Sequence, residues 1–155
     1  MAIQDTMDIK GSLTIQKRDL NNQLVEEIHA NNTIVTSGRR LVAQLFSKDF
    51  KDTIKPVSHI AIGGNDKAVS DDDLQLAQEI FRKKINPIKD SDLVVLPDKR
   101  IKLTITADLQ AEEGNAELKE AALFNEDKVM YNRVIFKPIN KTKNFTLTLI
   151  WEITF

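Results

Sequence analysis

The segment FTLTLIWEITF, residues 145–155, alternates between apolar and mostly polar side chains without a break. Alternate side chains of a β-strand point to opposite faces of the sheet, so this segment is predicted to be a strand with one fully apolar face. Ile150 interrupts the polar face, and we expect it to contact a partner or a covering helix. The residues that share the apolar face are Phe145, Leu147, Leu149, Trp151, Ile153 and Phe155.

The same alternation recurs along the chain. Residues 101–109 alternate as regularly as the last segment, and the turn at 97–100 joins them to the apolar run 94–96, which predicts a β-hairpin. We expect the second half of the chain to form a β-meander, with the last strand beside 101–109 and 129–137. The predicted fold is mainly β, an antiparallel β-sandwich or small barrel with one or two short helices. Further strands are predicted at 9–17, 24–28, 33–35, 59–62 and 118–124.

Residues 36–47 are predicted to form the main helix. Thr36 or Ser37 can cap the first amides of this helix. Its apolar residues recur at the spacing of one helical face, which we expect to face the core. Residues 71–81 are predicted to form a second short helix or an extended crossing segment. The apolar residues of the main helix are Leu41, Val42, Leu45 and Phe46.

The composition is that of a soluble globular protein, with 41% hydrophobic and 29% charged residues. We therefore expect a single domain over residues 1–155, with residues 1–8 as a flexible or partner-binding arm. The start of the chain lacks the apolar core of a secretory signal. No apolar run approaches the roughly 20 residues that span a bilayer, so no membrane insertion is expected.

The charge balance and the missing cysteine exclude several functional classes. The 22 basic and 23 acidic residues nearly cancel, which argues against a nucleic-acid partner. The chain contains no cysteine, which excludes disulfides, thiol nucleophiles and thiolate metal sites. His29 and His59 are isolated, and no HExxH, GxSxG, P-loop or GxGxxG motif is present. The glutamates between 112 and 120 are expected to be solvated around a glycine turn, so we predict no enzyme, no cofactor and no metal site.

One cluster of carboxylates follows the glycine pair at 63–64. A calcium loop is one interpretation, since hard cations bind clustered carboxylates and carbonyls. The spacing does not match an EF-hand, however, and a tight glycine turn before an acidic helix start explains the same residues. We favour the second interpretation. The aspartates concerned are Asp66, Asp71, Asp72 and Asp73.

Several short motifs, taken in order, resemble those of small structural proteins of phage tails and of phage-tail-like contractile injection systems, near the baseplate or tail fibres. Residues 32–43 resemble N-x-I-V-x-x-G-R-x-L-x-A, and residues 120–125 resemble E-A-G-L-F-(D/N), with Ala122 in place of the usual glycine. The resemblance covers about residues 32–155. The remaining matching segments are 59–64, 79–82, 133–141 and 149–155.

This resemblance implies a non-enzymatic building block that assembles in symmetric copies. Its partners would be other subunits of the particle (baseplate, sheath, tube or fibre proteins) and further copies of itself. The protein would be cytoplasmic during assembly and then part of a virion or an extracellular injection particle. Edge strands and exposed loops would supply the contacts. The candidate interface residues are Asp5 and Asp8 in the arm, Asp66, Asp71 and Asp72 in the acidic loop, and Ile150 on the last strand.

Two alternatives remain open. The first is a fibre domain that binds a cell-surface saccharide, although Tyr131 and Trp151 are the only tyrosine and tryptophan that could stack on a sugar. The second is an unrelated cytoplasmic β protein that binds a small molecule, which would need polar groups inside an apolar barrel to orient its ligand.

Overall fold

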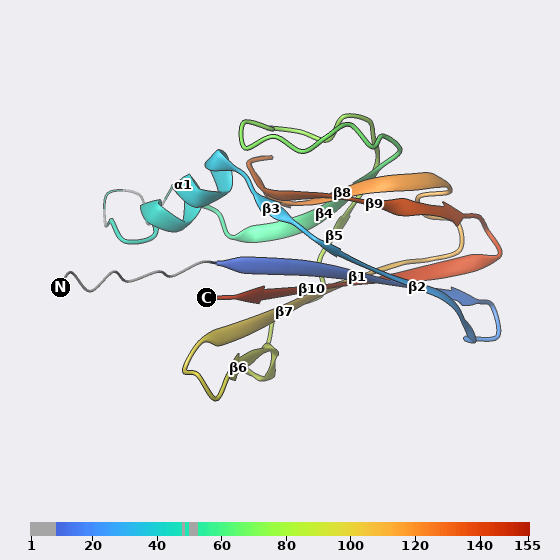
Figure 1. Cartoon of the computed structure of the whole chain (residues 1–155), viewed down its shortest axis with the longest axis horizontal. Coiled ribbons are helices and arrows are strands. Elements are labelled where there is room, and N and C mark those ends of the chain that lie inside the picture. Colours follow the sequence, from blue (N-terminus) through green and yellow to red (C-terminus); the bar gives the residue numbers. More distant parts are fainter. Residues whose placement is uncertain (1–8, 48, 50–52) are drawn as a thin grey trace.

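The computed structural model describes residues 9–47, 49 and 53–155, and in this part of the chain ten strands form two antiparallel sheets of five strands each. The two sheets lie one above the other as separate layers (Figure 1). The fold is therefore an antiparallel β-sandwich with one α-helix, which confirms the predicted mainly β class.

Sheet A contains the strand that the last segment of the sequence predicted. Its order is β2-β1-β10-β7-β6, and the central strand β10 pairs with β1 on one side and β7 on the other. Trp151 on β10 is completely buried, and its indole N–H donates to the side-chain oxygen of Asn32 at 3.1 Å. The strands of sheet A are β1 (Lys10–Asp19), β2 (Leu24–Asn31), β6 (Leu93–Val95), β7 (Ile101–Leu109) and β10 (Phe145–Thr154).

Sheet B is built around the β8–β9 hairpin, in the order β3-β9-β8-β4-β5. Its inner face packs against sheet A to form the main core, where each large side chain that leaves water stabilises the fold by about 1.5–3 kcal/mol. The strands of sheet B are β3 (Thr33–Ile34), β4 (Val57–Gly63), β5 (Glu79–Lys84), β8 (Ala116–Asn125) and β9 (Met130–Lys141).

The predicted meander of the second half is wrong. The chain passes from β7 in sheet A to β8 in sheet B, and returns from β9 in sheet B to β10 in sheet A. β9 is therefore not beside β10 but in the opposite layer. Alternation along a strand identifies the face that meets the core, but strands of both sheets meet the same core and carry the same pattern.

The helix α1 (Thr36–Gln44) is shorter than predicted and is held differently at its start. Neither predicted cap is used, because the Ser37 hydroxyl donates instead to the carbonyl of Met130 at 2.6 Å. Leu41 is buried as expected. Leu45 and Phe46 lie beyond the end of the helix and are 66% and 90% exposed, so the expectation that they face the core is wrong.

A long loop, residues 64–78, covers the outer face of sheet B, and it is seen above the upper layer in Figure 1. This loop contains no helix. Apart from α1, the only helical element of the described chain is a single 3₁₀ turn, η1 (Asp90–Asp92), which lies outside the loop. Under the loop, Leu76 joins a second apolar cluster on the outer face of the sheet, whose other members are Val35, Ala61, Ala122, Phe124 and Met130.

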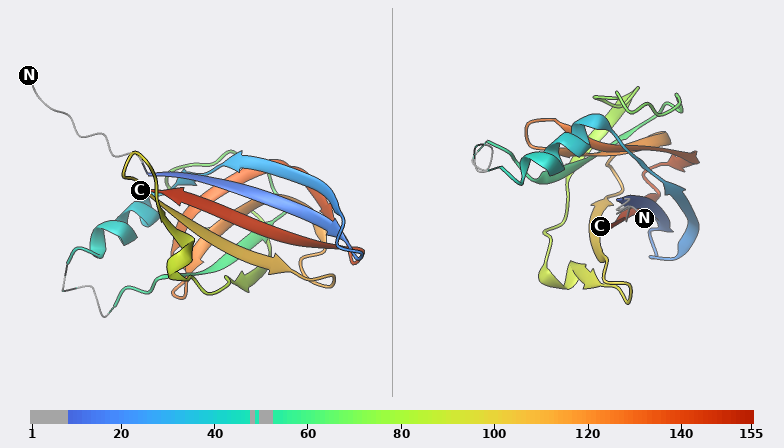
Figure 2. Two further views of the ribbon diagram at one scale, coloured as in Figure 1. Left: turned by 90° about the horizontal axis from the view of Figure 1, so that it is seen from below. Right: turned by 60° about the vertical axis from the view of Figure 1, so that its left-hand side comes forward.

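One end of the sandwich brings together segments that are far apart in the sequence. The start of β1 pairs with the end of β10, Lys10 opposite Thr154, and Thr154 lies opposite Lys102 of β7. Helix α1 lies at this same end (Figure 2).

Replacing Gly38 with alanine tests how closely α1 packs on β9. Alanine normally stabilises a helix interior by about 1 kcal/mol relative to glycine. At Gly38, however, an added Cβ would clash with the backbone carbonyl of Tyr131. We expect Gly38→Ala to lower the free energy of unfolding by about 1–3 kcal/mol in urea denaturation. Arg40→Ala, at an exposed position of the same helix, should change it by less than about 0.5 kcal/mol. A stabilising Gly38→Ala would contradict this packing.

Candidate functional site

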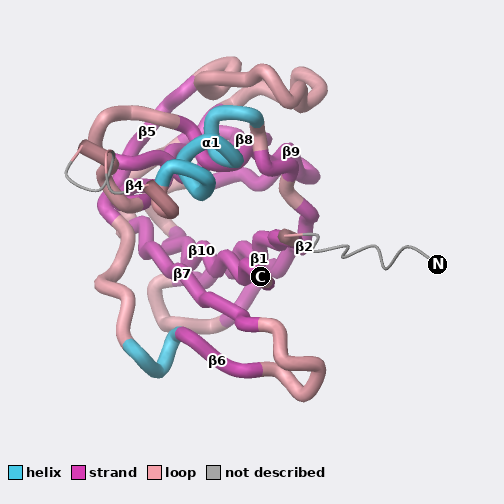
Figure 3. The backbone as a smooth tube through the Cα atoms, turned by 90° about the vertical axis from the view of Figure 1, so that its left-hand side faces the viewer, coloured by secondary structure: helices cyan, strands magenta, loops and turns pink. Residues whose placement is uncertain are grey.

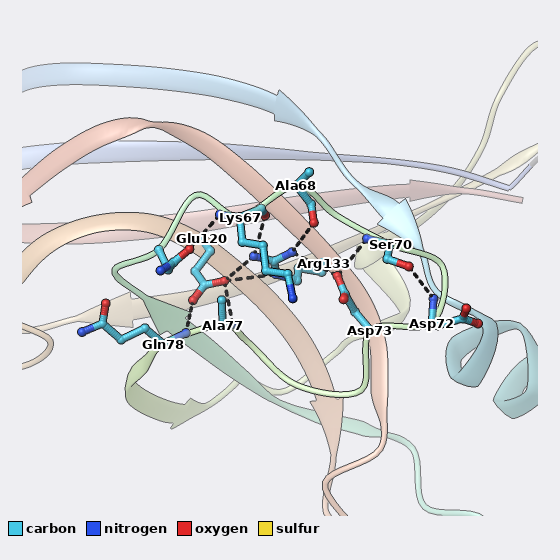
Figure 4. Close-up of polar contacts among 10 residues, drawn as sticks. Lys67, Ala68, Ser70, Asp72, Asp73, Ala77, Gln78, Glu120 and Arg133 are labelled. Atoms are coloured by element: carbon cyan, nitrogen blue, oxygen red, sulfur yellow. Dashed lines mark hydrogen bonds and ion pairs between the residues drawn. The ribbon is translucent and has the colours of Figure 1, made fainter.

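The acidic loop predicted from the sequence is fixed to sheet B by a buried arginine. Arg133 of β9 lies on the outer face of the sheet, and its side chain is 1% exposed. Its guanidinium donates to the Glu120 carboxylate of β8 from Nε at 3.0 Å and from Nη2 at 2.7 Å. Nη1 donates to the Asp73 carboxylate of the loop at 3.0 Å. Two carboxylates therefore flank one buried cation (Figure 4).

The same two side chains hold both arms of the loop through backbone groups. Arg133 also donates to the carbonyls of Lys67 and Ala68, at 3.0 and 3.5 Å. The Glu120 carboxylate accepts the amides of Ala77 and Gln78, at 3.1 and 2.7 Å (Figure 4). All five N–H donors of the guanidinium are thus used by protein oxygens, which leaves none for a ligand.

The loop is also connected to the start of α1. The first amide of the helix, that of Thr36, donates to the carbonyl of Asp71 at 2.7 Å. The Asp73 carboxylate accepts the amide of Ser70 at 3.0 Å. Backbone and side-chain bonds therefore fix the loop at its two arms and at its centre.

The structure places three of the predicted interface residues on this loop. Asp66, Asp71 and Asp72 are all exposed, whereas their neighbour Asp73 turns inward to Arg133. A hollow of about 650 Å³ opens between the arms of the loop, with Asp72, Asp73 and Arg133 among its lining residues. No group of three or more His, Cys, Asp or Glu side chains that could hold a metal ion occurs in the described residues.

Ile150 lies on the other side of the molecule, on the face of sheet A that points away from sheet B. It is half-buried between Thr14 of β1 and Thr106 of β7. Helix α1 does not cover it, because α1 packs on sheet B. The structure therefore separates Ile150 from the acidic loop by the full thickness of the sandwich. Asp5 and Asp8 lie outside the described residues.

The sequence did not predict the buried ion pair. Glu120 was assigned to a group of solvated turn glutamates, and this assignment is wrong because Glu120 is completely buried and ion-paired. A usable signal was present: Glu120 falls inside the predicted strand 118–124, next to Ala121 and Ala122. A carboxylate within an apolar strand requires a cation, because an unpaired buried charge is very costly.

A second hollow is apolar and lies at the α1 end of the sandwich. Its volume is about 340 Å³, and residues from both sheets and from α1 line it, including Leu41, Leu103 and Phe155. Tyr131 forms part of its wall, and the tyrosine hydroxyl has no hydrogen-bond partner among the described residues. Burial raises the pKa of Tyr131 to about 12, although nearby Arg39 acts in the opposite direction.

Comparisons of the chain with protein-family models, with curated proteins and with solved structures each gave no match. None of the described helices has the length and apolar content of a bilayer-spanning helix.

Removing the buried cation should release the loop. Arg133→Met leaves Glu120 buried without a partner, so we expect a loss of about 3–5 kcal/mol in the free energy of unfolding. We also expect faster tryptic cleavage after Lys67, which lies in the released loop. The matched control is Arg82→Met on the same face of the sheet, where the partner Glu79 is exposed and the expected loss is about 1 kcal/mol or less.

A second substitution separates charge from packing. In Arg133→Met/Glu120→Gln the completely buried carboxylate of Glu120 is no longer charged, although Asp73 still loses its ion pair with Arg133, and part of the lost stability should return. If Arg133→Met and Arg82→Met had equal effects on stability and on cleavage, the loop would not depend on this ion pair.

Alkaline titration should report the buried tyrosine. Tyr131 is the only tyrosine of the chain, so absorbance at 295 nm follows its ionisation alone. The folded protein should titrate near pH 12, and the unfolded chain in guanidinium near pH 10. Because the folded state holds the proton more tightly, the associated stabilisation is present below pH 10 and is lost between pH 10 and 12, by up to about 2.7 kcal/mol.

Tyr131→Phe should remove this pH dependence at little or no cost in stability at pH 7, because it deletes a hydroxyl that has no hydrogen-bond partner in the part of the chain that the structure describes. A folded-state titration near pH 10 would show that the phenol is exposed to water.

Proposed function

We propose that this protein is a non-enzymatic structural subunit of a phage-tail-like contractile injection particle, associated with the baseplate or the tail fibres. The resemblance of the ordered motifs between residues 32 and 155 supports this role. In this proposal, the protein acts by contact with neighbouring particle subunits, namely baseplate, sheath, tube or fibre proteins. It is made in the cytoplasm and then incorporated into the particle.

The observation that carries the proposal is an exposed apolar surface at the α1 end of the sandwich. Leu45 and Phe46 project there, and Leu45 lines the apolar hollow together with the exposed Ile88. Single exposed apolar side chains are common, but contiguous ones indicate contact with another molecule. A surface of this kind, on a rigid framework with a nearly neutral net charge, suits a protein partner.

A saccharide-binding role lacks a comparable observation. Tyr131 and Trp151, the only tyrosine and tryptophan of the chain, are both buried in the core and do not offer a ring to a sugar. The small-molecule alternative is favoured by one observation, the apolar hollow of about 340 Å³. Native mass spectrometry of the purified protein would detect a retained apolar ligand if this alternative were correct.

The proposal predicts that particles sedimented from the source cells contain this protein, as measured by mass spectrometry. Deleting its gene should give incomplete particles in electron micrographs. Phe46→Asp should fail to restore them, because it places a charge on the exposed apolar surface. Asn144→Asp, which adds the same charge at an exposed site elsewhere, should restore them.

The neighbouring genes provide an independent check. Genes for sheath, tube and baseplate proteins are expected beside this one. A metabolic neighbourhood, together with intact particles in the deletion strain, would rule out the proposed role.

A further inference from the structure

The outer edges of the two sheets differ in how they are protected from pairing with another chain. Edge strands normally carry charges that discourage such pairing. β5 contains Glu79, Arg82, Lys83 and Lys84, and β2 contains Glu26 and Glu27. β6 contains no charged residue, and its three residues Leu93, Val94 and Val95 are 48%, 44% and 68% exposed. β6 is therefore an apolar edge without charged residues, which only its short length protects.

The apolar character of β6 continues onto the sheet behind it. Leu93 lies opposite Leu103 of β7, and Val95 lies opposite Ile101, so these four side chains share one face. Leu103 in turn lines the apolar hollow at the end of the sandwich. Sheet B does not cover β6 itself, because β6 projects away from β8 and β9 (Figure 3).

The free edge of β6 also carries backbone groups that can hydrogen-bond to another strand. The amide of Leu96 donates to the carbonyl of Arg100 of the same hairpin at 2.8 Å. Alternation along the strand therefore turns the backbone groups of Val94 toward β7 and those of Leu93 and Val95 toward the open edge. The Leu93 amide bonds to the carbonyl of Asp90, which leaves the Leu93 carbonyl and both groups of Val95 on the open edge.

Charges flank the strand with opposite sign at its two ends. The turn that precedes β6 contains Lys89, Asp90 and Asp92 and has a net charge of −1. The turn that follows it contains Asp98, Lys99 and Arg100 and has a net charge of +1, with Asp98 ion-paired to Arg100. An antiparallel pair of such strands would set the acidic end of one beside the basic end of the other. A parallel pair would set like charges together.

We propose that two copies of this chain join edge to edge through β6, antiparallel about Val94, so that sheet A of one copy continues into sheet A of the other. The Val95 amide of each copy then donates to the Leu93 carbonyl of its partner. The two Val94 residues face each other across the two-fold axis as a non-hydrogen-bonded pair. This self-association goes beyond the proposed particle role and stands without it, since it rests on the edge of sheet A alone.

The dimer can be tested by sedimentation equilibrium on the full chain. We expect concentration-dependent dimerisation, weaker than about 1 µM because the paired strand is short. Val95→Lys should abolish it, because the lysine would enter the shared apolar face. The matched control is Val25→Lys, at a 49% exposed position on β2, the opposite edge of the same sheet, which should leave the dimer unchanged.

A cysteine placed on the axis tests the register. The chain has no cysteine, so a single introduced thiol gives an unambiguous result. In the proposed pairing the two Val94 Cα atoms are about 4.5 Å apart, within the range that a disulfide spans. Val94→Cys should therefore form a disulfide dimer under mild oxidation far faster than Val25→Cys.

A charge exchange tests the orientation. Asp90→Lys and Lys99→Glu should each weaken the dimer a few-fold, and the double variant should restore it. No recovery in the double variant would exclude the antiparallel orientation.

A chain that stays monomeric up to about 1 mM would overturn the proposal, because a dissociation constant above that value corresponds to a binding free energy of less than about 4 kcal/mol. So would dimerisation that Val25→Lys abolishes and Val95→Lys does not, or equal cross-linking of the two cysteine variants. Loss of the particle association alone would bear on the proposed function and not on this interface.

Discussion

The salt bridge between Arg133 and Glu120 is the interaction on which the outer half of this molecule depends. Both side chains lie on the outer face of sheet B and are almost completely buried, at 1% and 0% exposure. Desolvation of two charges is costly, and the pair is tolerable only because every remaining donor and acceptor finds a partner. Those partners are backbone groups of the loop 64–78 and the carboxylate of Asp73 in the same loop. If the loop moved away, the buried charges would lose these partners.

This arrangement explains how a loop without regular secondary structure can act as a third layer. The ion pair supplies the polar contacts, and Leu76 supplies an apolar one by packing with the second cluster beneath it. The carbonyl of Asp71 then receives the first amide of α1, which no side chain caps. The loop, the helix start and the β8–β9 hairpin are therefore one structural unit.

The sequence predicted nine of the ten described strands because their side chains alternate or are mostly apolar, which are local properties. It missed β5 (Glu79–Lys84), whose start falls in the segment 71–81 that was predicted to be a short helix or an extended crossing segment. It did not predict how the strands are divided between the sheets, since β9 and β10 present equally apolar faces to one shared core. The exposure of Leu45 and Phe46 was missed because the spacing of apolar residues does not indicate at which residue a helix ends. Asp66, Asp71 and Asp72 lie at the surface, but the acidic helix start predicted for this segment is wrong, because residues 64–78 form no helix. The role of Asp73 depends on an arginine 60 positions away and has no local signal.

The pairing of β1 with β10 joins the first and last described strands of the chain, with Lys10 opposite Thr154. Such distant partners make closure of sheet A a late event, because the entropy of the long intervening loop must be overcome before any contact is gained. During synthesis, β1 and β2 leave the ribosome long before β10 exists, and one edge of β1 stays open for that whole interval. A chain that stops before residue 145 would keep this edge open permanently. Such an incomplete product would expose unpaired backbone groups of β1 and would tend to pair with other chains, instead of folding into a defective subunit.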